Sequence, residues 1–210
     1  MVSKKQSKQT KFDLAKLHNK ASKEEVFFDW WLDELIEAHI IMGVKYQPKS
    51  FVITEPVKVA MLKQMKTKTT PFFKHLLYSH VYTADWIIDW HPDHEQQWTW
   101  SHREPTTRYN NPFSAYRRSD GLMRSVIDVK GTFNGKNNTS ATTFPLNQKA
   151  VFDKYNILVQ KIVPSKLFEQ TFTPLRYTFT DTGKPGRTID WKVRTLEEYL
   201  ETLKKTGELL

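Results

Sequence analysis

The feature that most constrains this chain is a pair of apolar, strand-like segments, each of which carries an acidic residue. Residues 80–90 contain Asp85, and residues 125–129 contain Asp128, with Lys130 two positions further on. Alternate side chains of a strand share a face, so Lys130 should lie beside Asp128. Two carboxylates brought together repel unless they hold a cation or share a proton, and carboxylate oxygens are ligands that Mg²⁺ prefers. The pattern therefore predicts a magnesium site with an adjacent lysine, although Asp128-Val129-Lys130 taken alone is more typical of a solvated strand end.

The charge balance indicates an anionic partner. The chain has 210 residues, of which 39% are hydrophobic, and 32 basic against 23 acidic residues give a net charge of +9. Nucleic acid is the commonest partner of such a chain, and an anionic membrane surface is the second. No apolar run reaches the about 18 residues that a membrane span needs, no secretory signal is recognisable, and there is no cysteine. We therefore expect a cytoplasmic protein without disulfides, in the host cytoplasm if it is viral.

Hydrophobic periodicity and turn residues predict a mixed sheet flanked by helices. The expected helices are 23–39, 146–155 and 195–205, and the expected strands are 44–54 (interrupted by Pro48), 80–90, 125–129 and 157–163. Between them lie an edge ribbon or loop (55–70), an irregular stretch (91–124), a mobile loop (134–143) and a turn at 183–186. The order helix, strand, strand, strand, helix, strand favours an α/β sandwich over a doubly wound fold.

Five short blocks in this order resemble a known family. They are Ser22-Lys23-Glu24-Glu25, Tyr46-Gln47-Pro48-Lys49, Tyr82-Thr83-Ala84-Asp85-Trp86, Asp128-Val129-Lys130-Gly131, and Phe144-Pro145-Leu146 with Lys149, Phe152 and Tyr155. Together they are similar to the small phage-borne nucleases of the PD-(D/E)xK superfamily, many of them Holliday-junction-resolvase-like. The resemblance covers residues 22–163.

The resemblance implies a restriction-endonuclease-like fold and a role for each block. It implies that Asp85 is the main metal ligand, that Asp128 and the Val129 carbonyl complete the site, and that Lys130 is the catalytic lysine. Glu25 would be the acid on the first helix, with Glu24 as the competing choice. The implied activity is Mg²⁺-dependent endonucleolytic hydrolysis of DNA, with Mn²⁺ as a substitute. Branched DNA such as a Holliday junction would be cut during phage replication, recombination or packaging, by a possible homodimer.

Three regions fall outside that pattern. Residues 1–20 should form a mobile basic arm, with seven lysines against one acid in residues 1–23, and residues 165–210 a C-terminal extension packed on a nuclease core at 21–164. Residues 91–124 stand where the family has a short hairpin. They interleave aromatic and basic residues, which suits base stacking and phosphate contacts by Trp98, Trp100, Arg103, Arg108, Arg117 and Arg118. An aromatic mini-core or a dimer contact would explain the same composition. Lys149 could reach a phosphate or be a solvated lysine.

Two other functions remain compatible with the sequence. The same site could belong to an exonuclease or a restriction-like nuclease acting on duplex DNA. Alternatively, the chain could be a non-catalytic basic DNA-binding or virion-associated protein.

Overall fold

A four-stranded path through a mixed sheet forms the centre of the molecule. The computed structural model describes residues 18–104, 111–131, 139–179 and 188–205. The strand order is β1 (Ile41–Tyr46), β6 (Trp86–Trp90), β10 (Met123–Val129) and β11 (Val159–Ile162), and the short β9 (Tyr116–Arg117) also pairs with β10. The first three strands are antiparallel, whereas β10 and β11 are parallel. The crossover between these parallel strands contains α4 (Thr139–Tyr155).

Helix α2 (Lys23–Glu37) begins where the sequence predicts, because Ser22 caps it. The Ser22 hydroxyl accepts a hydrogen bond from the Glu25 amide at 3.2 Å, and Glu24 and Glu25 occupy the first turn, where the helix dipole favours acids. The apolar side of the helix is completely buried, including Phe28, Trp31 and Leu35. The predicted helix 23–39 is thereby confirmed to within two residues.

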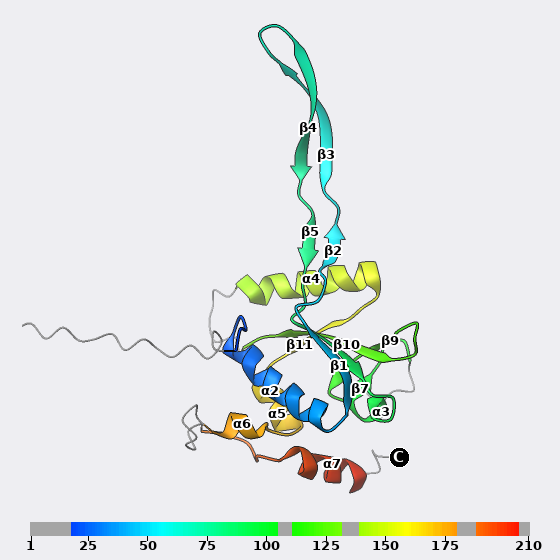
Figure 1. Cartoon of the computed structure of the whole chain (residues 1–210), viewed down its shortest axis with the longest axis vertical. Helices are drawn as coiled ribbons and strands as arrows, with labels where there is room; N and C mark the ends of the chain where they lie inside the picture. The colour runs from blue at the N-terminus through cyan, green and yellow to red at the C-terminus, as the bar shows by residue number, and fades with distance from the viewer. Residues whose placement is uncertain (1–17, 105–110, 132–138, 180–187, 206–210) are drawn as a thin grey trace, which may run out of the picture.

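Two hydrophobic cores lie on opposite faces of the sheet (Figure 1). Alternation along β10 separates them, since Ile127 and Val129 belong to the core shared with α2, while Val126 belongs to the core shared with α4. Helix α5 (Pro164–Gln170) and helix α7 (Leu196–Lys205) contribute to the α2-side core, and α6 (Leu175–Thr178) lies beside them. The fold is therefore the expected mixed α/β sandwich, and the C-terminal elements share its main core.

The longest feature of the chain is a two-stranded ribbon that projects from the sheet (Figure 1). The β1–β6 pair continues outward as β2 (Phe51–Thr54) with β5 (His80–Tyr82), and then as β3 (Val57–Gln64) with β4 (Thr69–Leu77). The sequence predicted a strand over 44–54 interrupted by Pro48, and the break between β1 and β2 lies at this proline. It also predicted a continuous strand over 80–90, which was wrong, because residues 83–85 leave the strand conformation and divide it into β5 and β6.

Residues 91–124 contain short elements rather than an open loop. These are α3 (Glu95–Trp98), β7 (Thr99–Trp100), β8 (Phe113–Ser114) and β9. Trp98 and Phe113 belong to the α2-side core, whereas Tyr116 packs against the core on the α4 side. Among the described residues, no helix is long and apolar enough to cross a membrane. The basic segment 1–17, residues 134–138 of the predicted loop and the predicted turn 183–186 lie outside the described residues. Residues 139–143, which the sequence assigned to that loop, belong instead to helix α4.

Candidate active site

The three residues Asp85, Asp128 and Lys130 meet at one end of the central strands. Asp85 lies in the break between β5 and β6, where its amide donates to Ile127 O at 3.0 Å and its carbonyl accepts from the Gln47 amide at 2.8 Å. Its Oδ2 atom accepts a hydrogen bond from the Val129 amide at 2.7 Å. These backbone contacts hold the Asp85 side chain against the end of β10, where Asp128 stands.

Asp128 is almost completely buried, with 3% of its surface exposed. The Tyr82 hydroxyl donates to its Oδ2 atom, and the Lys130 ammonium forms an ion pair with its Oδ1 atom. The same ammonium lies 3.9 Å from Asp85 Oδ2. The predicted alternation along the strand thus places Lys130 between the two carboxylates, and Tyr82 fixes the orientation of the second one.

The charges in this cluster do not balance. One ammonium faces two carboxylates, and burial followed by the charge of Asp128 raises the pKa of Asp85 to about 7. The charge of Lys130 and the hydrogen bond from Val129 oppose this rise without cancelling it. Asp85 therefore binds a proton unusually tightly, as expected for a carboxylate whose site lacks positive charge.

Glu25 reaches the same end of the sheet from the first turn of α2. It is 5% exposed, and its Oε2 atom accepts a hydrogen bond of 2.6 Å from the Tyr46 hydroxyl, while the Ser22 hydroxyl donates to its Oε1 atom. Burial and this hydrogen bond to Glu25 raise the pKa of Tyr46 to about 12. The Glu25 charge also adds a small contribution to the raised pKa of Asp85.

Glu24 approaches the site from a different side. A Cβ atom added at Gly131 would lie 3.3 Å from Glu24 Oε1, so the side chain covers the residue that follows Lys130. Glu24 is more exposed than Glu25. The structure therefore brings both acids to the cluster, with Glu25 the one built into a buried hydrogen-bond network.

The donor set suits a hard divalent cation. No group of three or more His, Cys, Asp or Glu side chains within the described ranges is arranged to hold a metal ion, so Glu25 does not join the aspartates as a third ligand. Mg²⁺ usually keeps several waters and binds through one or two carboxylates together with substrate phosphates. Asp85 and Asp128, with the Val129 carbonyl that the resemblance names, match this requirement.

The predicted DNA-stacking role of Trp98 was wrong. Trp98 is completely buried, packed against Trp31, Trp90 and Tyr199. Its helical turn closes the α2-side core, so the aromatic mini-core is the interpretation that fits this residue. Trp100, only partly covered, lines a hollow of about 510 Å³ with Gln160 and Tyr199.

The predicted phosphate-binding arginines lie at the opposite end of the central strands. Residues 91–122 join the end of β6 to the start of β10, whereas Asp85 precedes β6 and Lys130 follows β10. Arg117 pairs with Glu95 and Glu104, Arg118 pairs with Asp89 and Asp120, and Arg103 donates to the Asn156 carbonyl. Arg108 lies outside the described residues. Carboxylates already occupy Arg117 and Arg118, and their contact with DNA stays a prediction.

Lys149 is exposed on α4. It lines a largely apolar hollow of about 810 Å³ together with His102, Leu146 and Phe152. This position is compatible with either a phosphate contact or a solvated lysine.

Two tyrosines of the cluster were absent from the predicted site. Tyr82 and Tyr46 belong to the blocks that carry the family resemblance, but alternation alone does not show that their hydroxyls reach Asp128 and Glu25. Both hydroxyl contacts depend on how the ribbon and α2 pack on the sheet. Comparison with family models, with curated proteins and with solved structures finds no match to this chain. A function for it is therefore inferred from the geometry of the acidic cluster.

Proposed function

We propose that this protein is a divalent-cation-dependent DNA endonuclease with a restriction-endonuclease-like core. The observation that carries the proposal is the convergence of Asp85, Asp128 and Lys130 around an uncompensated negative charge at a sheet end. The order α2, β1, β6, β10, α4, β11 is compatible with it, because it is the helix–strand–strand–strand–helix–strand series from which the sequence predicted a mixed sheet flanked by helices.

Each residue of the cluster has a distinct task in this proposal. Mg²⁺ held by Asp85 and Asp128 would supply a Lewis acid for the scissile phosphate and a bound water of lowered pKa. Lys130 positions the attacking water or stabilises the negative charge that develops on the phosphate in the transition state. Tyr82 orients Asp128, and Glu25 and Tyr46 close the side of the site formed by α2.

Branched DNA is the proposed substrate class, and a homodimer is the proposed assembly. A four-way junction presents two symmetric scissile strands, which suits an enzyme with twofold symmetry. The net charge of +9 favours association with any DNA, so it supports the partner but does not select the junction.

The test is cleavage of four labelled substrates with Mg²⁺, Mn²⁺ or no divalent ion. They are a four-way junction, a linear duplex of the same sequence, a single strand and a covalently closed circle. We expect metal-dependent nicking of the junction and of none of the others at equal enzyme concentration. The mass of the free protein and of its complex with the junction gives the oligomeric state.

A matched pair of variants controls for contaminating nucleases. Asp85→Asn should remove the activity, and Asp93→Asn should retain it, because the Asp93 side chain is 80% exposed and lies beyond the far end of β6. Cleavage of linear ends with the closed circle left intact would indicate an exonuclease. Cutting of the linear duplex at a fixed sequence would indicate a restriction-like nuclease. Binding to DNA without cleavage of any substrate under all metal conditions would replace the proposal with a non-catalytic DNA-binding role.

A further inference from the structure

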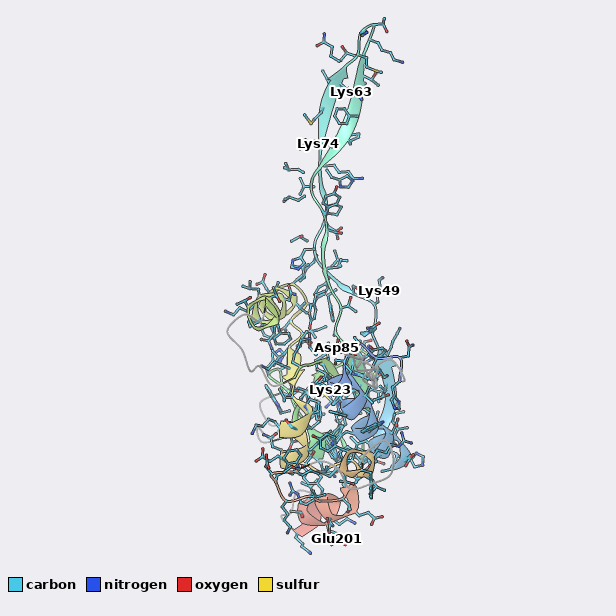
Figure 2. The ribbon with its side chains drawn as sticks, turned by 90° about the vertical axis from the view of Figure 1, so that its left-hand side faces the viewer. Lys23, Lys49, Lys63, Lys74, Asp85 and Glu201 are labelled. Atoms are coloured by element: carbon cyan, nitrogen blue, oxygen red, sulfur yellow. The ribbon has the colours of Figure 1, made fainter. Side chains whose placement is uncertain are left out.

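The projecting ribbon carries positive charge that the site itself does not use. Residues 55–79, which we name the β-arm, contain five lysines and one acid, Glu55. Strands β3 and β4 pair with each other over their whole length, and every residue of β4 is exposed. Figure 2 shows Lys63 near the tip, Lys74 along the shaft and Asp85 at the foot, with Glu201 at the opposite end of the molecule.

The β-arm also exposes large apolar side chains on both of its faces. Phe72 pairs with Met61 and Phe73 pairs with Ala60, and these neighbouring cross-strand pairs point to opposite faces. Phe72 is 40% exposed and Phe73 is 72% exposed. Lysines follow the same alternation, since Lys58 shares the Phe73 face, and Lys74 shares the Phe72 face. A partner that covers this ribbon must therefore be anionic and must surround it.

Strands β2 and β5, from which the β-arm extends, are fixed to the body of the protein. The Tyr155 hydroxyl and the Lys154 ammonium, both on α4, donate to Val52 O at 2.8 Å, and the rings of Phe51 and Tyr155 are 5.3 Å apart. On the other strand, Tyr82 donates to Asp128. Tyr82 therefore both fixes β5 to the body and orients Asp128, so the base of the ribbon and the acidic cluster share this contact.

We propose that the β-arm lies in the major groove of duplex DNA that flanks the phosphodiester at Asp85 and Asp128. This rests on the proposed function. A two-stranded ribbon fits the major groove, which is about 12 Å wide, but not the minor groove, which is about 6 Å wide. The phosphate backbones border the groove on both sides of the ribbon, within reach of long lysine side chains from either face. A second copy of this chain would instead bring five further lysines close to these five.

The length of the β-arm sets the DNA that it needs. The eight residues of β3 span about 26 Å at about 3.3 Å per residue. This corresponds to about seven to eight base pairs at about 3.4 Å each. Efficient binding therefore requires a duplex flank of at least this length on one side of the scissile phosphate.

The test compares two triple variants with the same change in charge. The tip variant is Lys63→Gln, Lys66→Gln and Lys68→Gln, and the control is Lys192→Gln, Lys204→Gln and Lys205→Gln, in the C-terminal segment that contains α7, whose Glu201 lies at the opposite end of the molecule (Figure 2). Affinity for a fluorescent 20-base-pair duplex is measured in Ca²⁺ at several salt concentrations. Each lost phosphate contact lowers the salt slope by about 0.9, so the tip variant should lose up to about 2.7 slope units and about 10- to 100-fold in affinity at 0.1 M salt. The control should retain the wild-type slope.

Two results would overturn the inference. One is a tip variant that binds with the wild-type slope and affinity. The other comes from a double variant with Leu62→Ser and Phe73→Ser. If this variant has a different mass in sedimentation but an unchanged affinity for DNA, the β-arm is a contact between copies of the chain. Binding and cleavage are separate readouts. If the wild-type protein binds DNA through the tip but cuts no DNA, the proposed nuclease activity is refuted and the β-arm assignment stands. If the wild-type protein cuts DNA and the tip variant binds and cuts equally well, only the β-arm assignment is refuted.

Discussion

Strands β6 and β10 carry a charged cluster at each of their two ends, and the two clusters differ in how their charges are balanced. At one end, Asp85 and Asp128 share the single ammonium of Lys130. At the other end, Asp89 alone accepts hydrogen bonds from two arginines, from Arg124 at 2.6 and 2.7 Å and from Arg118 at 2.9 Å. Burial by itself would raise the pKa of Asp89, but the hydrogen bonds and charge of Arg124 lower it.

The comparison separates a structural ion pair from a site that needs a ligand. Ile87 and Val126, which pair between the two clusters, pack in the same core, so the strands and the scaffold are common to both ends. The Asp89 end is neutralised by its own side chains. The Asp85 end has an excess of negative charge, which a divalent cation or a proton can relieve. The β-arm and its lysines lie at the Asp85 end, which agrees with an anionic substrate at that end.

The largest expected difference between the ends is in catalysis. Asp85→Ala should lower metal-dependent cleavage by on the order of 10³-fold or more, because it removes a ligand of an ion that contributes several kcal/mol of transition-state stabilisation. Affinity for DNA in Ca²⁺ should be largely retained. Asp89→Ala should leave cleavage within about twofold and instead destabilise the fold by about 1–3 kcal/mol, since two arginines lose their acceptor. Single-turnover cleavage and urea unfolding of both variants check this, and full activity in Asp85→Ala would remove it from the site.

A large effect on stability is expected at the arginine-rich end. Trp98→Ala should lower the free energy of unfolding by about 3–5 kcal/mol, because it empties a fully buried indole site. The affinity of the folded fraction for DNA should not change. Urea denaturation and DNA titration of the same preparation test this. A normal denaturation midpoint combined with weakened DNA binding would restore Trp98 as a stacking residue.

Lys130 should matter for the rate rather than for binding. Lys130→Ala should lower single-turnover cleavage by about 10²-fold, the scale expected on loss of one group that stabilises the transition state. Lys45→Ala, on the exposed side of β1, serves as the matched control and should cleave normally. A Lys130 variant whose defect is confined to salt-sensitive affinity would assign this lysine to DNA binding.

The raised pKa of Asp85 predicts a moderate dependence of stability on pH. The folded pKa of about 7 lies above the ordinary value of 3.8, so between these pH values the folded state binds more protons than the unfolded state. Without divalent ions, the stability contributed by Asp85 is therefore full below about pH 4, decreases as the pH rises to about 7, and is constant above it. Asp85→Asn should raise the Tm at pH 8, by about 2–4 °C for each kcal/mol of relieved repulsion. Mg²⁺ should raise the wild-type Tm more at pH 8 than at pH 5.5. An Asp85→Asn variant whose Tm changes with pH and Mg²⁺ in the same way as that of the wild type would contradict this.

The smallest effect is expected from the arginine pair. Arg117→Gln with Arg118→Gln should leave the salt slope of DNA affinity unchanged, because both guanidinium groups already pair with carboxylates. The change in stability should be about 1 kcal/mol or less for each of these partly exposed ion pairs. The titration used for the tip of the β-arm measures the slope. A decrease of about one unit for each arginine would show that DNA displaces the carboxylates and would move the duplex to this end.

The acidic cluster could be predicted from the sequence because strand alternation is a local property. Asp128 and Lys130 are two residues apart on one strand, so their shared face follows from the period of two. The N-cap Ser22 similarly placed Glu25 in the first turn of α2, and the apolar periodicity gave the order of helices and strands. The proximity of Asp85 to Asp128 needed the further expectation that their two strands pair, and β6 and β10 do pair.

Local patterns could not separate the two aromatic and basic regions of the chain. Residues 91–122 and the β-arm both mix aromatic and basic residues, and composition does not tell which set becomes buried. Only the packing of α3 and β8 against α2 buries Trp98 and Phe113, and only long-range pairing brings Arg118 to Asp89. The sequence by itself therefore determined the order of the helices and strands of the central sheet and the chemical character of the acidic cluster. The tertiary structure decided which charges remain unbalanced and which lysines stay exposed, because neutralisation and burial depend on residues that are distant along the chain.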